Sequence, residues 1–491
     1  MNSRLTVGSG LRADKHFPKY LLLILCGLLP LGLSGCATKR LKVDFTGFEK
    51  AYAQTSNQEM LLNLARLQNR DPTYFFKIGQ ITSAYKMAVS LTGTAGYTLQ
   101  STNVAVGSPA GSGTPGATYE NDPIFTFIPV NDETNAQLLL KPVPAESFYF
   151  LYEQGWRVDQ LVRLMVDRLE LTRYSAESHT CTVETIRNSP PADYSRDPAE
   201  VSSYATFLRI NAVIYWLQKH GYLLLRGSNT FVPYSMDNDS GIADSNAQNT
   251  PKGSDFVSAA QKNAVWQLDP TTKKWILGEK VFSPNFSLYP LTGTGSKMGP
   301  DIKTIESQIL ADPEMAELRQ GPALHQVLLA LSAGFTIEGT ANQLDACNSV
   351  AGTSGISTHL VMRSLIGLMA AAAQEQAPFD ALAQANPVIP NSPYLTPEQI
   401  AAIGAPPRFL EAVPSIERLP LLRMTGGGAD EQSSPVIQLN YRGTNYRIAD
   451  YKTEAGTPNQ YWNRDVFRLI NQLTSQVTVD ISKFPLTEIL Q

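Results

Sequence analysis

The feature that most constrains this chain is an apolar run, Tyr20 to Leu33, close to its N-terminus. Basic residues precede the run, and Pro30 and Gly32 weaken its far end. A helix needs about 20 apolar residues to cross the hydrocarbon core of a membrane, so this run is too short for a membrane span. The pattern is typical of a targeting segment that is removed from the mature protein. The fold must therefore be built from the residues that follow.

Leu33, Ser34, Gly35 and Cys36 close this segment and resemble the lipobox of bacterial lipoproteins. The resemblance implies that a signal peptidase recognises Leu33, Ser34 and Gly35 and that Cys36 becomes the lipidated first residue. In Gram-negative lipoproteins, Asp directly after this Cys favours the inner membrane, whereas this chain has Ala37. The resemblance thus implies a lipid anchor in the outer membrane, on its periplasmic face. An ordinary secretory signal with an incidental cysteine and an uncleaved anchor are the alternatives.

The composition excludes several classes of protein. The 491-residue chain has a net charge of −4, and loss of residues 1–35, with four basic and one acidic side chain, leaves −7. Nucleic-acid binding needs clustered Lys and Arg, and no such stripe is present, so the sequence predicts no nucleic-acid partner. With 43% hydrophobic residues the chain can bury a sizeable core, which excludes a disordered stalk.

Two cysteines, Cys181 and Cys347, remain in the mature chain, because Cys26 leaves with the signal and Cys36 carries the lipid. The oxidising compartment makes Cys181 and Cys347 a candidate disulfide. Two buried free thiols are the alternative, since sequence spacing cannot show that the two Cα atoms approach closely enough.

The segment after the first predicted helix has the pattern of a long β-hairpin. Tyr85, Met87, Val89 and Leu91 alternate with small or polar residues, which is the period of a strand, and an apolar return strand ends at Ile128. The first strand exceeds the roughly 9 to 11 residues that cross a bilayer when tilted. The hairpin Tyr85–Ile128 is therefore either an edge hairpin of a periplasmic sheet or a hairpin that each subunit contributes to an oligomeric outer-membrane barrel. Small side chains near the tip favour the sheet.

The whole pattern predicts an α+β fold, with helical subdomains packed against antiparallel β-hairpins and one long hairpin near the N-terminus. Helices are predicted where apolar residues recur about every 3.6 positions. These stretches are Phe45–Leu67, Trp156–Leu171, Pro198–His220, Ile302–Leu310, Ala323–Ala333, Thr358–Glu375 and Tyr461–Gln476. Shorter hairpins are predicted at Ala264–Leu277 and Val436–Ile448, each around a polar turn.

Changes in composition divide the chain into segments. These are a signal peptide (1–35), a tether (36–44), an N-terminal α+β domain with the long hairpin (45–233), a flexible insertion (234–263), a middle helical and β region (264–384), a Pro/Ala-rich connector (385–407) and a C-terminal hairpin and helix (408–491). The insertion is predicted because its Asp-, Asn-, Ser- and Gly-rich composition offers little apolar surface to offset the entropy of ordering.

The sequence lacks the motifs that identify common active sites. It has no Gly-x-Ser-x-Gly elbow, no His-Glu-x-x-His and no Gly-Lys-Ser/Thr phosphate loop. The mature histidines, His179, His220, His325 and His359, are scattered, and the acidic residues of the insertion do not match the spacing of a calcium-binding EF-hand loop. These observations predict no cofactor and no metal, and they favour a protein that is not an enzyme.

Several short segments resemble an uncharacterised family of Gram-negative envelope lipoproteins. They are Asn57–Asn63 with Arg66 and Arg70-Asp71-Pro72, then Gly155-Trp156, Asn440–Gly443 with Tyr446–Ile448, and Asn463–Phe467. The resemblance covers most of the mature chain. It implies a location in the cell envelope and no catalytic residue.

The sequence therefore predicts a lipid-anchored periplasmic protein that binds or organises proteins or polysaccharide of the envelope. A large chain without a converging catalytic pattern is more simply an interaction protein. Two alternatives remain. One is a homo-oligomeric outer-membrane export or pore complex that uses the hairpin Tyr85–Ile128, and the other is a glycan or peptide hydrolase with dispersed carboxylates.

Overall fold

The computed structural model describes residues 45–93, 113–129, 139–175, 180–234, 242–244, 250–262, 264–289, 301–319, 324–338, 356–389, 406–426, 435–452 and 457–478. The predicted signal peptide and tether lie outside these residues. The chain forms two compact units, Met1–Leu61 and Leu62–Gln491. The boundary falls within a helix that spans residues 45–68, which confirms the predicted helix Phe45–Leu67.

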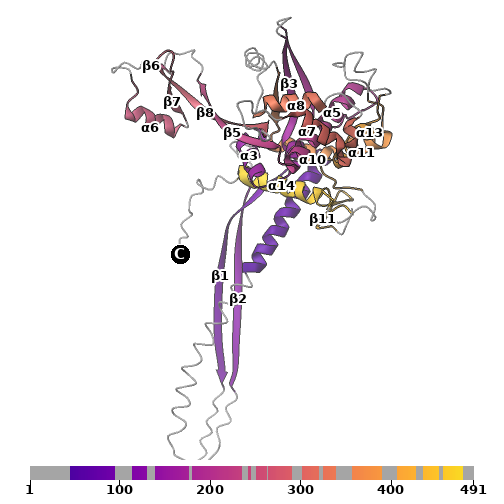
Figure 1. Ribbon diagram of the computed structural model, residues 1–491. Helices are drawn as coiled ribbons and strands as arrows, with labels where there is room; N and C mark the ends of the chain where they lie inside the picture. Colours follow the sequence, from indigo (N-terminus) through magenta and orange to yellow (C-terminus); the bar gives the residue numbers. More distant parts are fainter. Residues whose placement is uncertain are drawn as a thin grey trace, which may run out of the picture. The chain divides into compact units, whose positions relative to one another are not determined.

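Helices and strands are interspersed along the second unit (Figure 1), which confirms the α+β class. The strands are β1 (Phe76–Gly93), β2 (Gly113–Pro129), β3 (Val166–Ser175), β4 (Thr180–Arg187), β5 (Leu223–Pro233), β6 (Ile242–Asp244), β7 (Val265–Leu268), β8 (Lys274–Leu288), β9 (Phe335–Glu338), β10 (Ile356–Met362), β11 (Ile437–Tyr441) and β12 (Thr444–Ile448). The helices are α3 (Ala145–Glu153), α4 (Val158–Met165), α5 (Pro198–Lys219), α6 (Gly253–Gln261), α7 (Ile302–Ala311), α8 (Leu324–Ala333), α10 (Leu365–Gln374), α11 (Gln376–Ala385), α13 (Phe409–Ala412) and α14 (Trp462–Thr478), with 3₁₀ turns η2 (Pro313–Arg319) and η3 (Ser415–Glu417).

Within the described ranges, the main sheet of the second unit has eight strands. Six of them follow one another in the order β4-β3-β10-β9-β8-β5, and β6 and β7 also pair with β8. Strands β9 and β10 are parallel, whereas the other neighbours on this path are antiparallel. Strands that are far apart in the sequence, such as β3 and β10, are therefore direct neighbours in the sheet.

One face of this sheet belongs to the core. Leu169, Leu360 and Ile337 are register partners across β3, β10 and β9, and none is more than 1% exposed. Phe286 of β8 meets Phe148 of α3 edge-on, with 5.6 Å between the ring centroids. Complete burial of such side chains contributes about 2 kcal/mol each relative to exposure. Helical segments therefore cover the apolar face of the sheet.

The longest helix of the second unit shows how local signals set its ends. The side chain of Asp197 accepts hydrogen bonds from the backbone N–H groups of Ala199 and Glu200, both at 3.1 Å, and Pro198 begins α5. Gly221 follows the helix with a φ of 73°, a conformation that glycine adopts without strain. The predicted helix Pro198–His220 is confirmed.

Two predicted helices, Trp156–Leu171 and Thr358–Glu375, are each wrong over part of their length. The first is helix α4 as far as Met165 and then continues as β3. The second begins as strand β10, and helix α10 starts only at Leu365. The strands form because β3 and β10 pair with each other, and this long-range pairing overrides the local helical pattern.

The shorter predicted hairpins are confirmed, since β7 pairs with β8 and β11 pairs with β12. Between β11 and β12, Arg442 and Gly443 have φ values of 51° and 81°. Positive φ at both central residues is the conformation of a type I′ hairpin turn. Strands β1 and β2 are also paired antiparallel, from Phe76 opposite Pro129 to Gly93 opposite Gly113. The tip between them lies outside the described residues.

The predicted flexible insertion, 234–263, contains regular structure that its composition did not predict. Strand β6 pairs with β8, and α6 is a helix in which Asp255 accepts a hydrogen bond from the backbone N–H of Lys252. The ring of Phe256 meets Trp275 edge-on at 5.5 Å, so this helix gains an aromatic contact that the polar composition did not indicate. Among the described helices, none is both long enough and apolar enough to cross a membrane.

Candidate functional site

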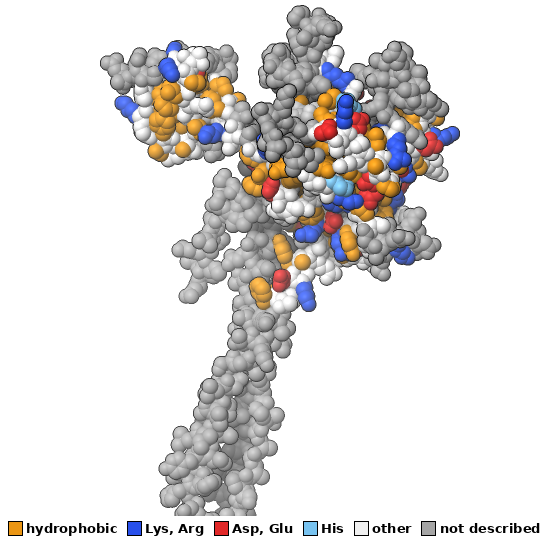
Figure 2. Space-filling model, in the orientation of Figure 1, with side chains coloured by type: hydrophobic (Ala, Val, Ile, Leu, Met, Phe, Trp, Pro, Cys, Tyr) orange, Lys and Arg blue, Asp and Glu red, His pale blue; other side chains and the backbone are white. Residues whose placement is uncertain are grey.

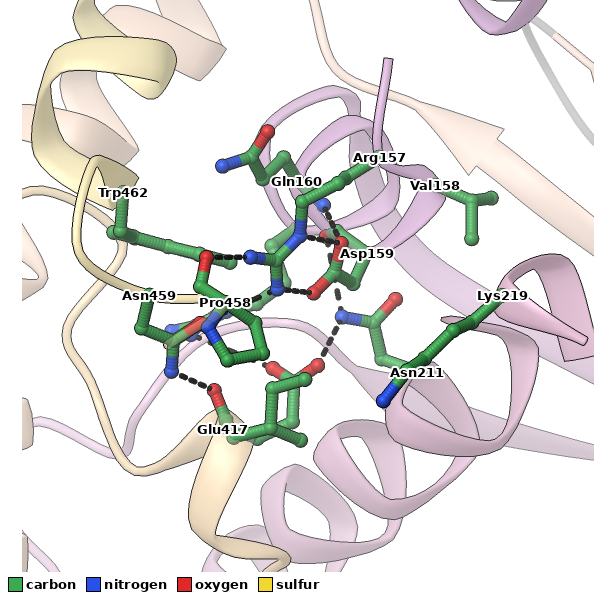
Figure 3. Close-up of polar contacts among 12 residues, drawn as sticks. Arg157, Val158, Asp159, Gln160, Asn211, Lys219, Glu417, Pro458, Asn459 and Trp462 are labelled. Atoms are coloured by element: carbon green, nitrogen blue, oxygen red, sulfur yellow. Dashed lines mark hydrogen bonds and ion pairs between the residues drawn. The ribbon is translucent and has the colours of Figure 1, made fainter. Parts of the chain in front are cut away.

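A buried charge cluster joins α4, α5 and η3 (Figure 3). We define it as Arg157, Asp159, Arg163, Asn211 and Glu417. Arg163 and Glu417 form an ion pair at 3.5 Å, and Arg157 donates hydrogen bonds to both carboxylate oxygens of Asp159. Apart from Arg157, every member is at most 1% exposed. The cluster therefore fixes polar and charged groups of three separate segments inside the protein.

Within the buried charge cluster, Asn211 connects Asp159 of α4 with Glu417 of η3. Its side-chain amide donates to the backbone oxygen of Asp159 at 3.1 Å and to Oε1 of Glu417 at 2.8 Å. The guanidinium groups of Arg157 and Arg163 lie 5.4 and 5.3 Å from the ring centroid of Trp462, at the start of α14. This arrangement brings α14 to the same point and adds cation–π attraction to the hydrogen bonds.

Burial raises the pKa of Glu417 to about 8, because an enclosed carboxylate loses its hydration, and the charge of Arg163 acts in the opposite direction. Perturbed pKa values often mark functional sites. Here Glu417 is 0% exposed, so a substrate cannot reach it. We therefore interpret the buried charge cluster as a tertiary connection between helices and not as an active site.

The face of the main sheet opposite the core carries a line of polar residues. The strand registers pair Thr185 with Glu170, Glu170 with His359, His359 with Thr336, Thr336 with Asn285 and Asn285 with Arg226. Register partners lie on the same face, so these six residues cross six strands in one line, which we call the polar row. Strands lie about 4.8 Å apart, which makes the polar row roughly 24 Å long.

The polar row is accessible to solvent over much of its length. Thr185 and Arg226, at its two ends, are exposed, and His359, Thr336 and Asn285 are partly exposed. The amide of Asn285 donates to Oγ1 of Thr336 at 3.2 Å, which holds two neighbouring members in place. The polar row is thus a preformed surface of hydrogen-bonding groups.

Two pairs of side chains are in hydrogen-bonding contact near the centre of the polar row. Oγ of Ser357 lies 2.7 Å from Nε2 of His359 on β10, and Nε of Arg168 donates to Glu170 at 2.8 Å on β3. A serine next to a histidine is the start of a nucleophilic triad, in which a carboxylate orients the imidazole. Glu170 is instead engaged by Arg168, and it is only 4% exposed. The geometry favours binding through hydrogen bonds over activation of Ser357.

Of the predicted lipidation site and disulfide, only Cys181 lies within the described residues. Leu33, Ser34, Gly35 and Cys36 lie outside the described residues, and their roles stay predictions. Cys181, on β4, is disulfide-bonded. The other cysteines of the chain, Cys347 among them, lie outside the described residues, so the pairing of Cys181 with Cys347 also stays a prediction.

The described histidines lie in three different surroundings. His220 stacks on Trp216 with 4.0 Å between ring centroids, Nδ1 of His325 lies 2.9 Å from Glu306, and His359 belongs to the polar row. Within the described ranges, no three His, Cys, Asp or Glu side chains come close enough together to hold a metal ion.

Sequence reasoning missed the polar row because Glu170 and His359 fell inside the two wrongly predicted helices. The polar residues Arg168, Glu170 and Thr172 alternate with Leu169 and Leu171, which is the period of a half-buried strand. This pattern was present in the sequence, but it was short and directly followed the strong helical spacing of α4. Even a correct strand assignment would not have shown which residues face one another across strands.

A smaller apolar surface lies on α6 and β7. Phe256, Val257 and Leu268 are 38%, 58% and 39% exposed. In Figure 2, hydrophobic side chains gather over this segment, whereas Lys and Arg are interspersed with Asp and Glu elsewhere on the face shown. A small group of exposed apolar residues is ordinary on a protein surface, so the polar row is the better candidate site.

Comparison with known proteins assigns no family to this chain. No family model, curated protein or solved structure matches it. The candidate site accordingly rests on its geometry alone.

Proposed function

We propose that this chain is a lipid-anchored protein of the bacterial envelope that binds another envelope component and catalyses no reaction itself. The polar row carries the proposal, because it sets donors and acceptors, most of them exposed or partly exposed, along one sheet face while helical segments cover the other face. The lipobox at Cys36 supports attachment to the periplasmic face of the outer membrane. The short segments that resemble uncharacterised envelope lipoproteins support the same location.

Photo-crosslinking in living cells tests this function. A photoreactive amino acid at the exposed position Thr185 is expected to give an adduct of higher mass, because a partner on the polar row lies within its reach. The same amino acid at Thr271, in the exposed turn between β7 and β8, is the matched control and is expected to give no such adduct. An adduct at neither position, or equally at both, contradicts the proposal. Metabolic labelling with a clickable palmitate checks the anchor in the same cells. The chain is expected to incorporate the label, and Cys36→Ser is expected to abolish its incorporation.

The register of β1 and β2 favours a second candidate function, a subunit of an oligomeric membrane pore. Alternate positions of β1 hold Met87, Val89 and Leu91, opposite Tyr119, Ala117 and Pro115. Alternation of apolar and polar positions is the pattern of strands in membrane barrels. Among the described strands, β1 and β2 pair only with each other, so each has an edge to which another copy can add.

Dye release from lipid vesicles separates the pore from the binding protein. If the hairpin forms a pore, the purified full chain is expected to release an entrapped dye, and a variant without residues 85–128 is expected to release none. Chemical crosslinking of the vesicle-bound chain should then show an oligomer. A monomer that releases no dye contradicts the pore.

A further inference from the structure

The charges around the polar row indicate the chemistry of its ligand. The polar row and the alternate positions beside it hold three arginines and two glutamates, namely Arg168, Arg187, Arg226, Glu170 and Glu338. Arg168 is engaged with Glu170. Arg187 and Arg226 are exposed, and neither forms an ion pair with a carboxylate of the described residues. These two lie on β4 and β5, so available positive charge is found at both ends of the polar row.

Between these arginines, the polar row and the neighbouring Ser357 offer groups that both donate and accept hydrogen bonds. They are the hydroxyls of Thr185, Thr336 and Ser357, the amide of Asn285 and the imidazole of His359. Sugar hydroxyls have the same double character, so they match the exposed and partly exposed groups of this surface. Protein partners instead bury aromatic or apolar anchors at the centre of an interface, and every member of the polar row is a polar residue.

The direction of the polar row also argues against a peptide. A peptide that binds a sheet usually extends it along an edge strand, through backbone hydrogen bonds. The polar row runs across six strands, where only side chains can make contact. A line of roughly 24 Å suits an extended polymer that is recognised through its own hydroxyl and acid groups.

We propose that the polar row binds an acidic glycan, with Arg187 and Arg226 contacting its acid groups and the residues between them contacting its hydroxyls. This inference rests on the proposed binding function and specifies the class of its ligand. Charge complementarity at the two ends would set the position of the glycan, because charged hydrogen bonds are about twice as strong as neutral ones.

Isothermal titration of the purified full chain in detergent tests the inference with three probes. Oligogalacturonate is the acidic glycan, a cello-oligosaccharide of the same length is the neutral glycan, and oligo-glutamate is the acidic peptide. We expect oligogalacturonate to bind at least about tenfold more tightly than either of the others, a difference of about 1.4 kcal/mol. Only this probe combines both kinds of group that the polar row recognises.

Substitutions in the full chain test the assigned residues. The double variant Arg187→Gln, Arg226→Gln is expected to lower affinity for oligogalacturonate about tenfold or more, and Thr336→Val several-fold. The matched control is Arg196→Gln, because Arg196 is an exposed arginine in the loop before α5 that pairs with Asp193. This control should leave affinity unchanged. Thermal unfolding of each variant confirms that the fold is kept.

The outcomes separate the glycan inference from the proposed function. Equal affinity for oligo-glutamate and oligogalacturonate overturns the glycan, because charge alone would then explain binding. If no glycan binds but a protein is crosslinked at Thr185, the glycan inference fails and the binding function stands. If no glycan binds and no adduct forms, both fail.

Discussion

Arg163→Met is expected to lower the free energy of unfolding by about 3 kcal/mol. The buried guanidinium donates to the backbone oxygen of Leu419 at 2.8 Å and pairs with Glu417 at 3.5 Å. Loss of one partner of a buried ion pair costs about 3–5 kcal/mol, because the other charge loses its compensation. We expect the lower end, since burial raises the pKa of Glu417 to about 8, so this carboxyl is already largely protonated at neutral pH and leaves little uncompensated charge when Arg163 is absent. Urea denaturation at neutral pH measures the loss.

Two further variants make this prediction specific. Arg187→Met, at an exposed arginine, is expected to change stability by less than about 0.5 kcal/mol. The double variant Arg163→Met, Glu417→Gln is expected to recover part of the loss, because no ionisable carboxyl then remains without a partner. If Arg163→Met costs no more than Arg187→Met, the buried charge cluster does not hold α4, α5 and η3 together.

The free energy of unfolding is expected to fall as the pH rises from about 5 to 8, and Glu417→Gln should reduce this fall. The pKa of Glu417 is about 8 in the folded chain, against an ordinary value of 4.5. Between these values the folded chain holds a proton that the unfolded chain releases. The stabilisation that the Glu417 proton gives the folded chain is therefore complete below about pH 4.5. It is lost as the pH rises through 8, at roughly 1 kcal/mol per pH unit.

Urea denaturation of the wild type and the variant across this pH range isolates Glu417. Burial also raises the pKa values of Glu375 and Asp465, so the wild-type slope contains contributions of the same sign from both. Glu417→Gln retains the oxygen that accepts a hydrogen bond from Asn211. Glu153→Gln, at an exposed site, is the control and should leave the slope unchanged. Identical slopes for the wild type and Glu417→Gln would show that Glu417 does not titrate in this way.

Predictions from the sequence succeeded where the determinants are local. Helix α5 has a capping Asp197, Pro198 in its first turn and Gly221 after its end, and all three act within a few residues. The hairpin of β11 and β12 has Arg442-Gly443 at its turn, where both residues adopt the positive φ that this turn requires. Such elements follow from short windows, because the backbone hydrogen bonds that define them close over a few residues.

The same reasoning failed where partners come from distant parts of the chain. The stretch that contains Glu170 was assigned to a helix because α4 and the start of β3 share apolar residues at helical spacing. This stretch forms a strand because β3 pairs with β10. The pairing satisfies the backbone hydrogen-bonding groups of β3 and places Leu169 opposite Leu360 in the core. The buried charges of Arg163 and Glu417 were missed for a similar reason, because neither residue has an unusual local neighbourhood.

By itself, the sequence determined the α+β class, the helices with clear caps, the short hairpins and the prediction of a lipid anchor at Cys36. Periodicity, capping and turn chemistry act over a few residues, so they can be recognised without the fold. Only the tertiary structure decided the polar row and the buried charge cluster. Both depend on how β3, β10 and η3, which are far apart along the chain, come together. Strand register and side-chain burial are properties of that packing, and no short stretch of sequence contains them.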